Sequence, residues 1–474
     1  MNKYKKLAYE TKMFFKGTFV SKIILILVIP LCTLFLSQED FQNAMTLQNT
    51  VELTALLFTV GITEGFFKSD LDKNADRKML YSTGLIFCVV SLAASMFSLL
   101  LIWCIREFRP YILYAAVYSF VSTIRTFIQC NVKIKKLDKL YMIDNVFNAV
   151  ILLIMIFLGV GFFKGGIKAY YISMIISCFV SIIFLNFSGN MRHDFSMRSV
   201  NFNVVKPVLR YSFSLLPVFM FWPTLMLTDQ LILKILISEE GNAVFIASYT
   251  IPGLILYMTT MFFRSFQTTG GEDLTHEERK KYSIKTFDIY SAVIFTVAAV
   301  ILFLIRILDK LIAPALAYAD TYQFSALLTG AAVMQSLCIL IGSIYADTNN
   351  NKRLASTSVL TVIMNFFLNI LFILLFKAKG AAIGTLVSLT ICVVIRTLET
   401  QSIAKFKLNW TNIEFNFVIL LGMMLVILFK LKYMGIFLLI GMLIIIFRNI
   451  KLLKKAYALI NLADPKKSII KDAE

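Results

Sequence analysis

Long apolar runs recur along the whole chain and limit what it can fold into. Fourteen of them are roughly as long as the 18–25 residues that an α-helix needs to cross a bilayer. The runs cover residues 15–36, 44–67, 80–105, 110–131, 140–163, 169–188, 209–237, 244–266, 287–309, 322–346, 355–376, 380–402, 413–430 and 433–449. This pattern predicts an all-α integral membrane protein with about 14 transmembrane helices.

The composition supports the membrane prediction and argues against a nucleic-acid partner. Hydrophobic residues make up 58% of the chain, whereas a soluble domain holds about 45–50%. A net charge of +19 would suggest nucleic-acid binding if the basic residues covered a soluble surface. Most of the 47 Lys and Arg residues instead lie in short loops between apolar runs, where membrane topology accounts for them.

Basic and acidic loops alternate along the chain and predict its orientation. The segments 37–43 and 238–242 contain acidic residues and no Lys or Arg, so we place them outside. Basic loops stay in the cytoplasm, which predicts a multi-pass protein of the inner (plasma) membrane with both termini cytoplasmic. The longest loops, 191–208 and 267–285, are then cytoplasmic. The second is expected to form a short surface helix, capped by Thr275 with Glu278 three residues later.

Signatures of bound cofactors are missing from the sequence. It contains no phosphate-binding loop of the form GxxxxGK[ST]. Its two histidines, His193 and His276, fall in cytoplasmic loops, and its seven cysteines have no metal-ligand spacing. We therefore expect no cofactor and no metal, and we do not expect an enzyme. Any transport would be driven by an ion gradient or by the gradient of the substrate itself.

A weak internal repeat divides the chain into two halves. The turn SQEDF at Ser37 resembles SEEGN at Ser238, and FKGGIKAYYISMIIS from Phe163 resembles FKAKGAAIGTLVSL from Phe376. Each pair occupies the same place in a six-span unit, which predicts a parallel repeat with the substrate site between two lobes. The expected parts are an N-terminal lobe (1–190), a cytoplasmic linker (191–208), a C-terminal lobe (209–403), two further helices (404–449) and a basic tail (450–474).

Ionisable residues inside the runs are the first functional candidates, because a charge at the bilayer centre costs about 2.5–3.5 kcal/mol on insertion scales. The run 209–237 carries Asp229, deep in the span, and Lys234, nearer its outer end. Lys22 lies close to the inner membrane edge, so it either faces the cavity or snorkels to the interface. Arg396 stands three residues before Glu399, a spacing that favours a local salt bridge.

Two further runs carry polar stripes. In 110–131 one helical face holds Tyr111, Tyr114, Tyr118, Ser122, Arg125 and Gln129. That guanidinium could bind a phosphate and the tyrosines could stack on sugars; alternatively, Arg125 pairs with a neighbouring helix. In 44–67, Glu52 and Glu64 could carry a proton or a cation. Alternatively, Glu52 pairs with Lys22 or Arg125, or snorkels.

Asparagines occur in matching pairs, one pair in each half. Asn145 and Asn148 lie in 140–163, and Asn365 and Asn369 lie in 355–376. Asparagine side chains commonly hydrogen-bond between transmembrane helices, so we favour helix packing over ligand contact for all four.

Several motifs occur in an order and spacing that resemble a known family. They are Ser21–Lys22 with Pro30, GITEGFFK at Gly61, LRYSFSLLP at Leu209 followed by Asp229, YADTNNNKR from Tyr345, and GAAIGT from Gly380. With them, the chain resembles Wzx-type flippases for O-antigen or capsule repeat units. These flippases belong to the polysaccharide-transporter branch of the multidrug/oligosaccharidyl-lipid/polysaccharide (MOP) exporter superfamily. Two departures are Gln230, where a basic residue often follows the Asp, and fourteen runs instead of twelve.

The resemblance implies two six-helix lobes in a V-shaped, MATE-like arrangement around a central cavity. The implied activity moves undecaprenyl-diphosphate-linked oligosaccharide from the inner to the outer leaflet by alternating access, coupled to H⁺ or Na⁺. Lipopolysaccharide, capsule or exopolysaccharide synthesis would use the product, with polymerase and assembly proteins as partners in the surrounding membrane lipid. The candidate cavity residues are Lys22, Tyr114, Tyr118, Arg125, Lys234 and Arg396, and the ion-coupling candidates are Glu52, Glu64 and Asp229.

Three other functions stay open at this point. A MATE-like drug/cation antiporter would favour an acidic, aromatic pocket. A lipid II flippase would differ mainly in being indispensable for growth. A non-transporting membrane scaffold for polymer-synthesis enzymes would tolerate neutralisation of the charges inside the spans.

Overall fold

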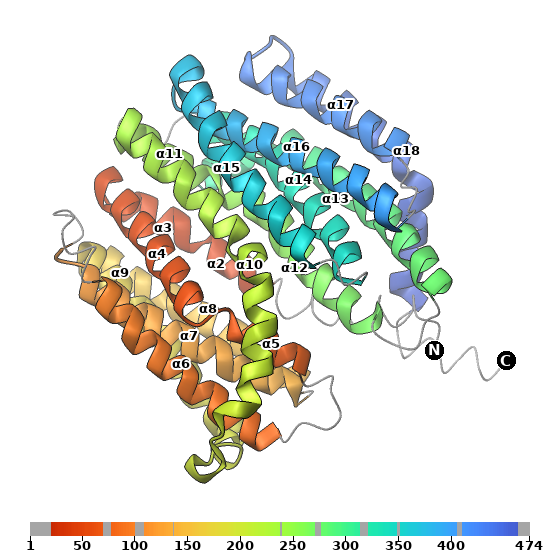
Figure 1. Cartoon of the computed structure of the whole chain (residues 1–474). Helices are drawn as coiled ribbons and strands as arrows, with labels where there is room; N and C mark the ends of the chain where they lie inside the picture. The colour runs from red at the N-terminus through yellow and green to blue at the C-terminus, as the bar shows by residue number, and fades with distance from the viewer. Residues whose placement is uncertain are drawn as a thin grey trace. The chain divides into compact units, whose positions relative to one another are not determined.

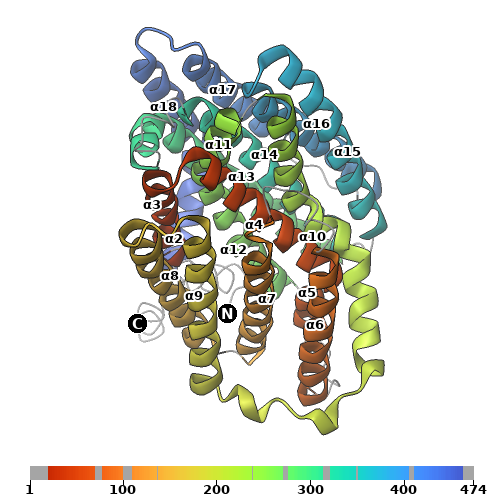
Figure 2. The same cartoon turned by 90° about the vertical axis from the view of Figure 1, so that its left-hand side faces the viewer.

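The computed structural model is helical throughout the residues that it describes (Figures 1 and 2), which are 20–69, 77–99, 109–135, 137–237, 239–270, 276–312, 321–347, 351–404 and 410–462. Each of the fourteen predicted runs coincides with one helix or with two successive helices. Eleven described segments are long and apolar enough to cross a membrane. The chain is therefore a multi-pass membrane protein.

Helices of the first half form one compact unit, Val20–Ile246. Its main helices are α2 (Val20–Ile26), α3 (Val28–Phe35), α4 (Gln38–Phe58), α5 (Ile62–Ser69), α6 (Arg77–Leu99), α7 (Ile112–Ile134), α8 (Asp138–Ile156), α9 (Gly166–Ser188) and α10 (Phe202–Leu236). A π-helical turn, Phe157–Phe162, extends α8. Both α7 and α8 pack against α9, while α4 and α6 pack against α7.

The second unit consists of the described residues from Ala247 onwards. Its helices are α12 (Thr250–Gly270), α13 (His276–Ile312), α14 (Thr321–Asp347), α15 (Asn351–Phe376), α16 (Lys379–Ala404), α17 (Trp410–Leu428) and α18 (Met434–Leu462), and α11 (Glu239–Ser248) precedes them. Here α14 and α15 pack against α16, while α12 and α13 pack against α14. These pairings repeat those of the first unit, as expected for two related six-helix halves. The last two helices pack against α13 and α14.

Helix α10 is an exception to the repeat. By its order in the chain it corresponds to α2 and α3, which pack against α8, yet α10 packs against α4, α5 and α6. The approach is close at Gly65 of α5, where an added Cβ would lie 2.1 Å from the Ser212 hydroxyl of α10. The first packing unit thus ends at Ile246, one long helix beyond the predicted linker 191–208.

Prolines and one glycine explain why three of the predicted runs are broken helices. A proline clashes with the carbonyl group four residues before it and leaves that group without a hydrogen bond. Pro30 falls four residues after the last residue of α2, and Pro252 falls four residues after the last residue of α11. Between α4 and α5 the chain turns through Val60 and Gly61, which have φ angles of 54° and 60°. Glycine adopts such an angle without strain.

Two predicted loops are wrong in their boundaries. The outer loop expected at 37–43 is helical from Gln38, because the Ser37 hydroxyl accepts a hydrogen bond from the Asp40 amide at 3.1 Å and caps α4. The surface helix expected in 267–285 is not separate from the next span, because α13 runs continuously from His276 to Ile312. The expected cap residue, Thr275, lies outside the described residues.

Candidate functional site

Two helices of the first unit, α4 and α7, are unusually polar for membrane helices. With 21 and 23 residues, both are long enough to span a bilayer, yet neither is among the eleven segments that are also apolar enough. Polar helices of this length usually turn their polar side chains toward neighbouring helices or water. The polar side chains of α4 and α7 contact side chains of α8, α9 and α10.

Arg125 of α7 lies in a buried polar cluster. Its Nη2 atom is 2.6 Å from Asp144 Oδ2 of α8, and its Nε atom donates to the Ser181 hydroxyl of α9 at 2.6 Å. Asp144 is fully buried and also accepts hydrogen bonds from the Ser181 hydroxyl and from Gln129 Nε2. The positive charge of Arg125 is thus neutralised, and the cluster ties α7, α8 and α9 together. Among the predicted alternatives, this contact is the pairing with a neighbouring helix.

Sequence reasoning missed Asp144, the partner of Arg125. It directly precedes Asn145, one of the predicted helix-packing asparagines, which accepts a hydrogen bond from Gln129 at 2.9 Å. No spacing rule links position 125 to position 144 on a different helix. The available signal was that an arginine within a membrane span requires an anion nearby.

Glu52 of α4 lies in a second cluster, which contains neutral partners. Its Oε1 atom accepts hydrogen bonds from Tyr118 Oη of α7 at 2.8 Å and from Gln48 Nε2 at 2.9 Å. Tyr170 Oη of α9 donates to Gln48 at 2.6 Å, and the Tyr171 ring centroid lies 6.3 Å from that of Tyr118. Glu52 itself is exposed, and its Oε2 atom accepts no hydrogen bond from the described residues. Of the two basic partners considered as an alternative for Glu52, Lys22 and Arg125, the second pairs with Asp144 instead.

A polar seam joins α4 to α10. Asn49 Nδ2 donates to Gln230 Oε1 at 3.1 Å, and Lys234 Nζ donates to Asn43 Oδ1 at 3.1 Å. On the helical wheel, Thr46 lies between positions 43 and 49. It therefore occupies the centre of the α4 face toward α10. Within the described part of the chain, the Thr46 hydroxyl and Gln230 Nε2 are buried and have no hydrogen-bond partner.

The side chains of this seam between α4 and α10 are all polar, and none of them is acidic. We define the α4–α10 seam as Gln42, Asn43, Thr46, Asn49, Gln230 and Lys234. Gln42 is fully buried one turn before Thr46, and neither of its amide atoms has a partner among the described residues. The seam therefore consists of amides, one hydroxyl and one ammonium group, with no carboxylate.

The remaining candidates of the first unit occupy separate positions. Asp229 is fully buried on α10, about 100° around the helix from Gln230. Lys22 on α2 and Tyr114 on α7 are half-buried. Glu64 falls on α5, but its side chain lies outside the described residues.

Arg396 belongs to the second unit and is 2% exposed. Its guanidinium donates to the Cys338 carbonyl of α14 at 2.8 Å and to the Ser358 hydroxyl of α15 at 2.7 Å. The Glu399 carboxylate instead accepts from Tyr345 Oη at 2.8 Å. The local salt bridge expected from their spacing is thus replaced by contacts that tie α14, α15 and α16 together.

The asparagines of the second half join α15 to α16. Asn365 Nδ2 donates to the Thr385 and Ser388 hydroxyls at 3.2 and 3.3 Å, and Asn369 Nδ2 donates to Asn365 at 3.1 Å. In the first half, Asn145 contacts Gln129 of α7, while Asn148 is buried on α8. Asn145 and Asn365 thus contact neighbouring helices, and a helix-packing role stays the prediction for all four asparagines.

The structure joins some of the predicted site residues and adds others. It brings Tyr118 to Glu52 and places Lys234 beside α4. Several residues were missed by sequence reasoning: Asn43, Gln48, Tyr170 and Asp144. The four share one property that no spacing rule captures. Each hydrogen-bonds to a side chain on a different helix.

No protein-family model matches the sequence, and no curated protein matches it. The structure is similar to that of an outward-facing multidrug resistance transporter of the MATE family and MOP superfamily. The TM-score is 0.66 at 12% identity, over 85% of this chain and 96% of that one. An inward-facing MATE structure gives a TM-score of 0.62 at 12% identity, over 81% and 96% of the two chains.

A variant of the Vibrio cholerae MATE transporter VcmN has a TM-score of 0.61 to this chain at 13% identity, over 85% of this chain and 98% of that one. At such low identity the similarity concerns the fold alone. The chain is a multi-pass membrane protein with the fold of MATE family transporters of the MOP superfamily.

Proposed function

We propose that this protein is a flippase for lipid-linked oligosaccharides. Its substrate would be an undecaprenyl-diphosphate-linked repeat unit, moved from the inner to the outer leaflet for O-antigen, capsule or exopolysaccharide synthesis. The polar head would pass through the protein while the polyprenyl tail stays in the bilayer. The transporter fold and the sequence resemblance to Wzx-type flippases both support this proposal.

The chemistry of the α4–α10 seam is the observation that carries the proposal. Amide and hydroxyl groups both donate and accept hydrogen bonds, as the hydroxyl groups of sugars do. The ammonium group of Lys234 supplies the positive charge that a phosphate oxygen requires. A site for organic cations would instead need carboxylates, which the seam does not contain.

The Glu52 cluster supports ion coupling. Its carboxylate is held by the neutral donors Tyr118 and Gln48, so a proton or Na⁺ can bind without breaking an ion pair. Exposure of Glu52 gives such an ion access to the carboxylate. We therefore assign the coupling role to Glu52, with H⁺ or Na⁺ as the ion.

One observation favours a second candidate, a MATE-like cation antiporter. The Glu52 carboxylate lies beside the rings of Tyr118, Tyr170 and Tyr171, whose neighbouring centroids are 5.5–6.3 Å apart. A carboxylate next to aromatic rings suits an organic cation, through charge attraction and cation–π contact. The antiporter would use the Glu52 cluster for its substrate, whereas the flippase would use it for the coupling ion.

Purified protein in liposomes separates the two functions. We expect translocation of an undecaprenyl-diphosphate-linked oligosaccharide, and we expect Lys234→Gln to slow it at least about ten-fold. A charge-assisted hydrogen bond is worth about 1.5–3 kcal/mol, and ~1.4 kcal/mol corresponds to ten-fold. Initial rates are measured by access of a sugar-oxidising reagent to the head group.

Lys206→Gln is the matched control, because Lys206 is an exposed lysine on the same helix. It should leave the rate unchanged. Gradient-driven uptake of a cationic dye without any oligosaccharide translocation would support the antiporter instead. Equal translocation by Lys234→Gln and Lys206→Gln would remove the seam from the substrate path.

A further inference from the structure

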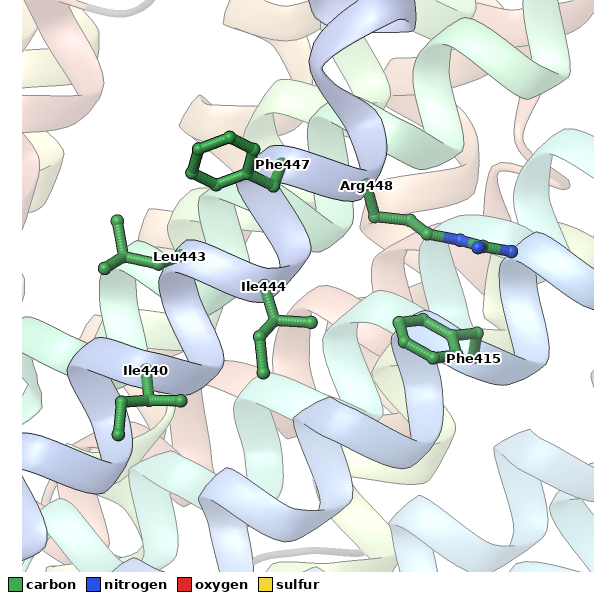
Figure 3. Close-up of a pocket in the computed structure, with 6 residues that line it drawn as sticks. All are labelled: Phe415, Ile440, Leu443, Ile444, Phe447 and Arg448. Carbon is green, nitrogen blue, oxygen red and sulfur yellow. The ribbon is translucent and has the colours of Figure 1, made fainter.

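An open groove is formed by exposed side chains of α17 and α18. The two helices are antiparallel, since Asn416 and Asn449 exchange hydrogen bonds at 3.2 and 3.4 Å and Gly441 packs against Met423. The groove is shallow, offers about 400 Å³ of space, and is lined by Phe415, Ile440, Leu443, Ile444, Phe447 and Arg448 (Figure 3). Its lining is apolar apart from the one guanidinium group at its end.

Arg448 is held in place at that end of the groove. Its guanidinium carbon lies 4.6 Å from the Phe415 ring centroid, and its Nε atom donates to Asn412 Oδ1 of α17 at 3.3 Å. Figure 3 shows the guanidinium extended across the Phe415 ring. Neither Nη group donates a hydrogen bond to a described residue. Four N–H donors are therefore pre-oriented and available to an anion.

The basic character continues along the same face of α18. The positions 440, 444, 447, 451 and 454 fall on one helical stripe. Its first three residues are exposed and apolar, with Phe447 72% exposed, and its last two are the exposed lysines Lys451 and Lys454. At 1.5 Å per residue, the apolar part from 440 to 447 extends for about 10 Å, and the basic part from Arg448 to Lys454 extends for about 9 Å. Lys455 is not part of this basic stripe, because it interacts electrostatically with Asp288 of α13.

We propose that this groove binds an anionic phospholipid. One acyl chain would lie against Ile440, Ile444 and Phe447, and the phosphate group would receive hydrogen bonds from Arg448 and charge attraction from Lys451 and Lys454. An apolar stripe that ends in a basic cluster at the membrane edge matches the two parts of such a lipid. A second copy of the chain fits less well, because a two-fold contact would bring Arg448 and Lys451 toward their own equivalents.

Native mass spectrometry of the full-length protein in detergent tests the proposal, with phosphatidylglycerol and phosphatidylcholine of equal chain length as probes. We expect retention of phosphatidylglycerol over phosphatidylcholine. Arg448→Gln should weaken phosphatidylglycerol binding about five-fold, and Arg448→Gln with Lys451→Gln about 25-fold. These values follow from ~1 kcal/mol for each basic residue near an anionic lipid surface.

Lys432→Gln is the control, since Lys432 is an exposed lysine in the turn that precedes α18, and it should bind like the wild type. Lys451→Gln alone tests the site without removing the contacts that Arg448 makes to α17. Equal retention of both phospholipids, or unchanged binding in the Arg448 and Lys451 variants, would overturn the proposal. So would a preference for undecaprenyl phosphate over phosphatidylglycerol, which would make the groove a substrate contact. Equal retention of both phospholipids, or unchanged binding in the variants, would leave the flippase proposal intact, because translocation in liposomes tests that proposal separately.

Discussion

Asp144→Ala is expected to leave little folded protein in the membrane. The substitution removes the only charged partner of Arg125 that the described residues provide, and the mostly buried guanidinium would then lack an anion. Removing one partner of a buried ion pair destabilises a protein by about 3–5 kcal/mol, which approaches the whole stability of many folded proteins. The readout is the amount of monodisperse protein extracted from membranes, together with its thermal midpoint.

A double variant distinguishes the loss of the Arg125–Asp144 ion pair from the effect of leaving one charge without a partner. Arg125→Met with Asp144→Leu removes both charges and keeps apolar side chains of similar volume, so it should recover most of the folded protein. Ser181 would lose two hydrogen-bond partners and Gln129 one, a smaller cost than an unpaired charge. Normal levels of Asp144→Ala would contradict the structural role of the cluster and would return Arg125 to the list of cavity residues.

Glu52→Gln is expected to abolish gradient-driven transport while the folded protein is retained. Glutamine has a similar shape and can still accept the hydrogen bonds from Tyr118 and Gln48, but it carries no charge that a proton or Na⁺ could neutralise. Moving one charge across about 100 mV is worth ~2.3 kcal/mol, or roughly 50-fold in an accumulation ratio. The ratio should fall by that factor in liposomes under an imposed potential.

Exchange without a gradient is the internal control for Glu52→Gln, because substrate binding at the α4–α10 seam does not require Glu52. Glu39→Gln, at an exposed position in the first turn of α4, should behave like the wild type. Loss of exchange together with accumulation would place Glu52 in substrate binding. That result would favour the cation antiporter.

The number and order of the helices could be predicted from the sequence because each span is recorded locally in its apolar length. Breaks near Pro30 and Pro252 follow from the same local chemistry, although the uniform hydropathy of those runs concealed them. The start of α4 was missed because a hydroxyl cap at Ser37 outweighs the polarity of the residues after it. The packing of α10 against α4 was not predictable, since no local pattern records which helices become neighbours.

Spacing along the sequence could assign side chains to one face of a single helix, but it could not assign their partners on other helices. The stripe on α7 correctly placed Tyr118 and Arg125 on one face, yet the two side chains serve different clusters. Spacing could assign a face to Arg125 but not the carboxylate 19 residues away that neutralises it. Similarly, the i, i+3 spacing of Arg396 and Glu399 predicted a pair, whereas a tyrosine and backbone carbonyl groups from other helices satisfy the two charges.

The leaflet distribution of undecaprenyl-linked sugars, in cells with and without the gene, tests the proposed function most directly. A flippase predicts that loss of the gene traps the lipid-linked repeat unit in the inner leaflet and that the wild-type gene restores its appearance outside. The Glu52→Gln variant should fail to restore it at matched protein levels. An unchanged distribution after loss of the gene would contradict the flippase function, and cation efflux would then be the activity to measure.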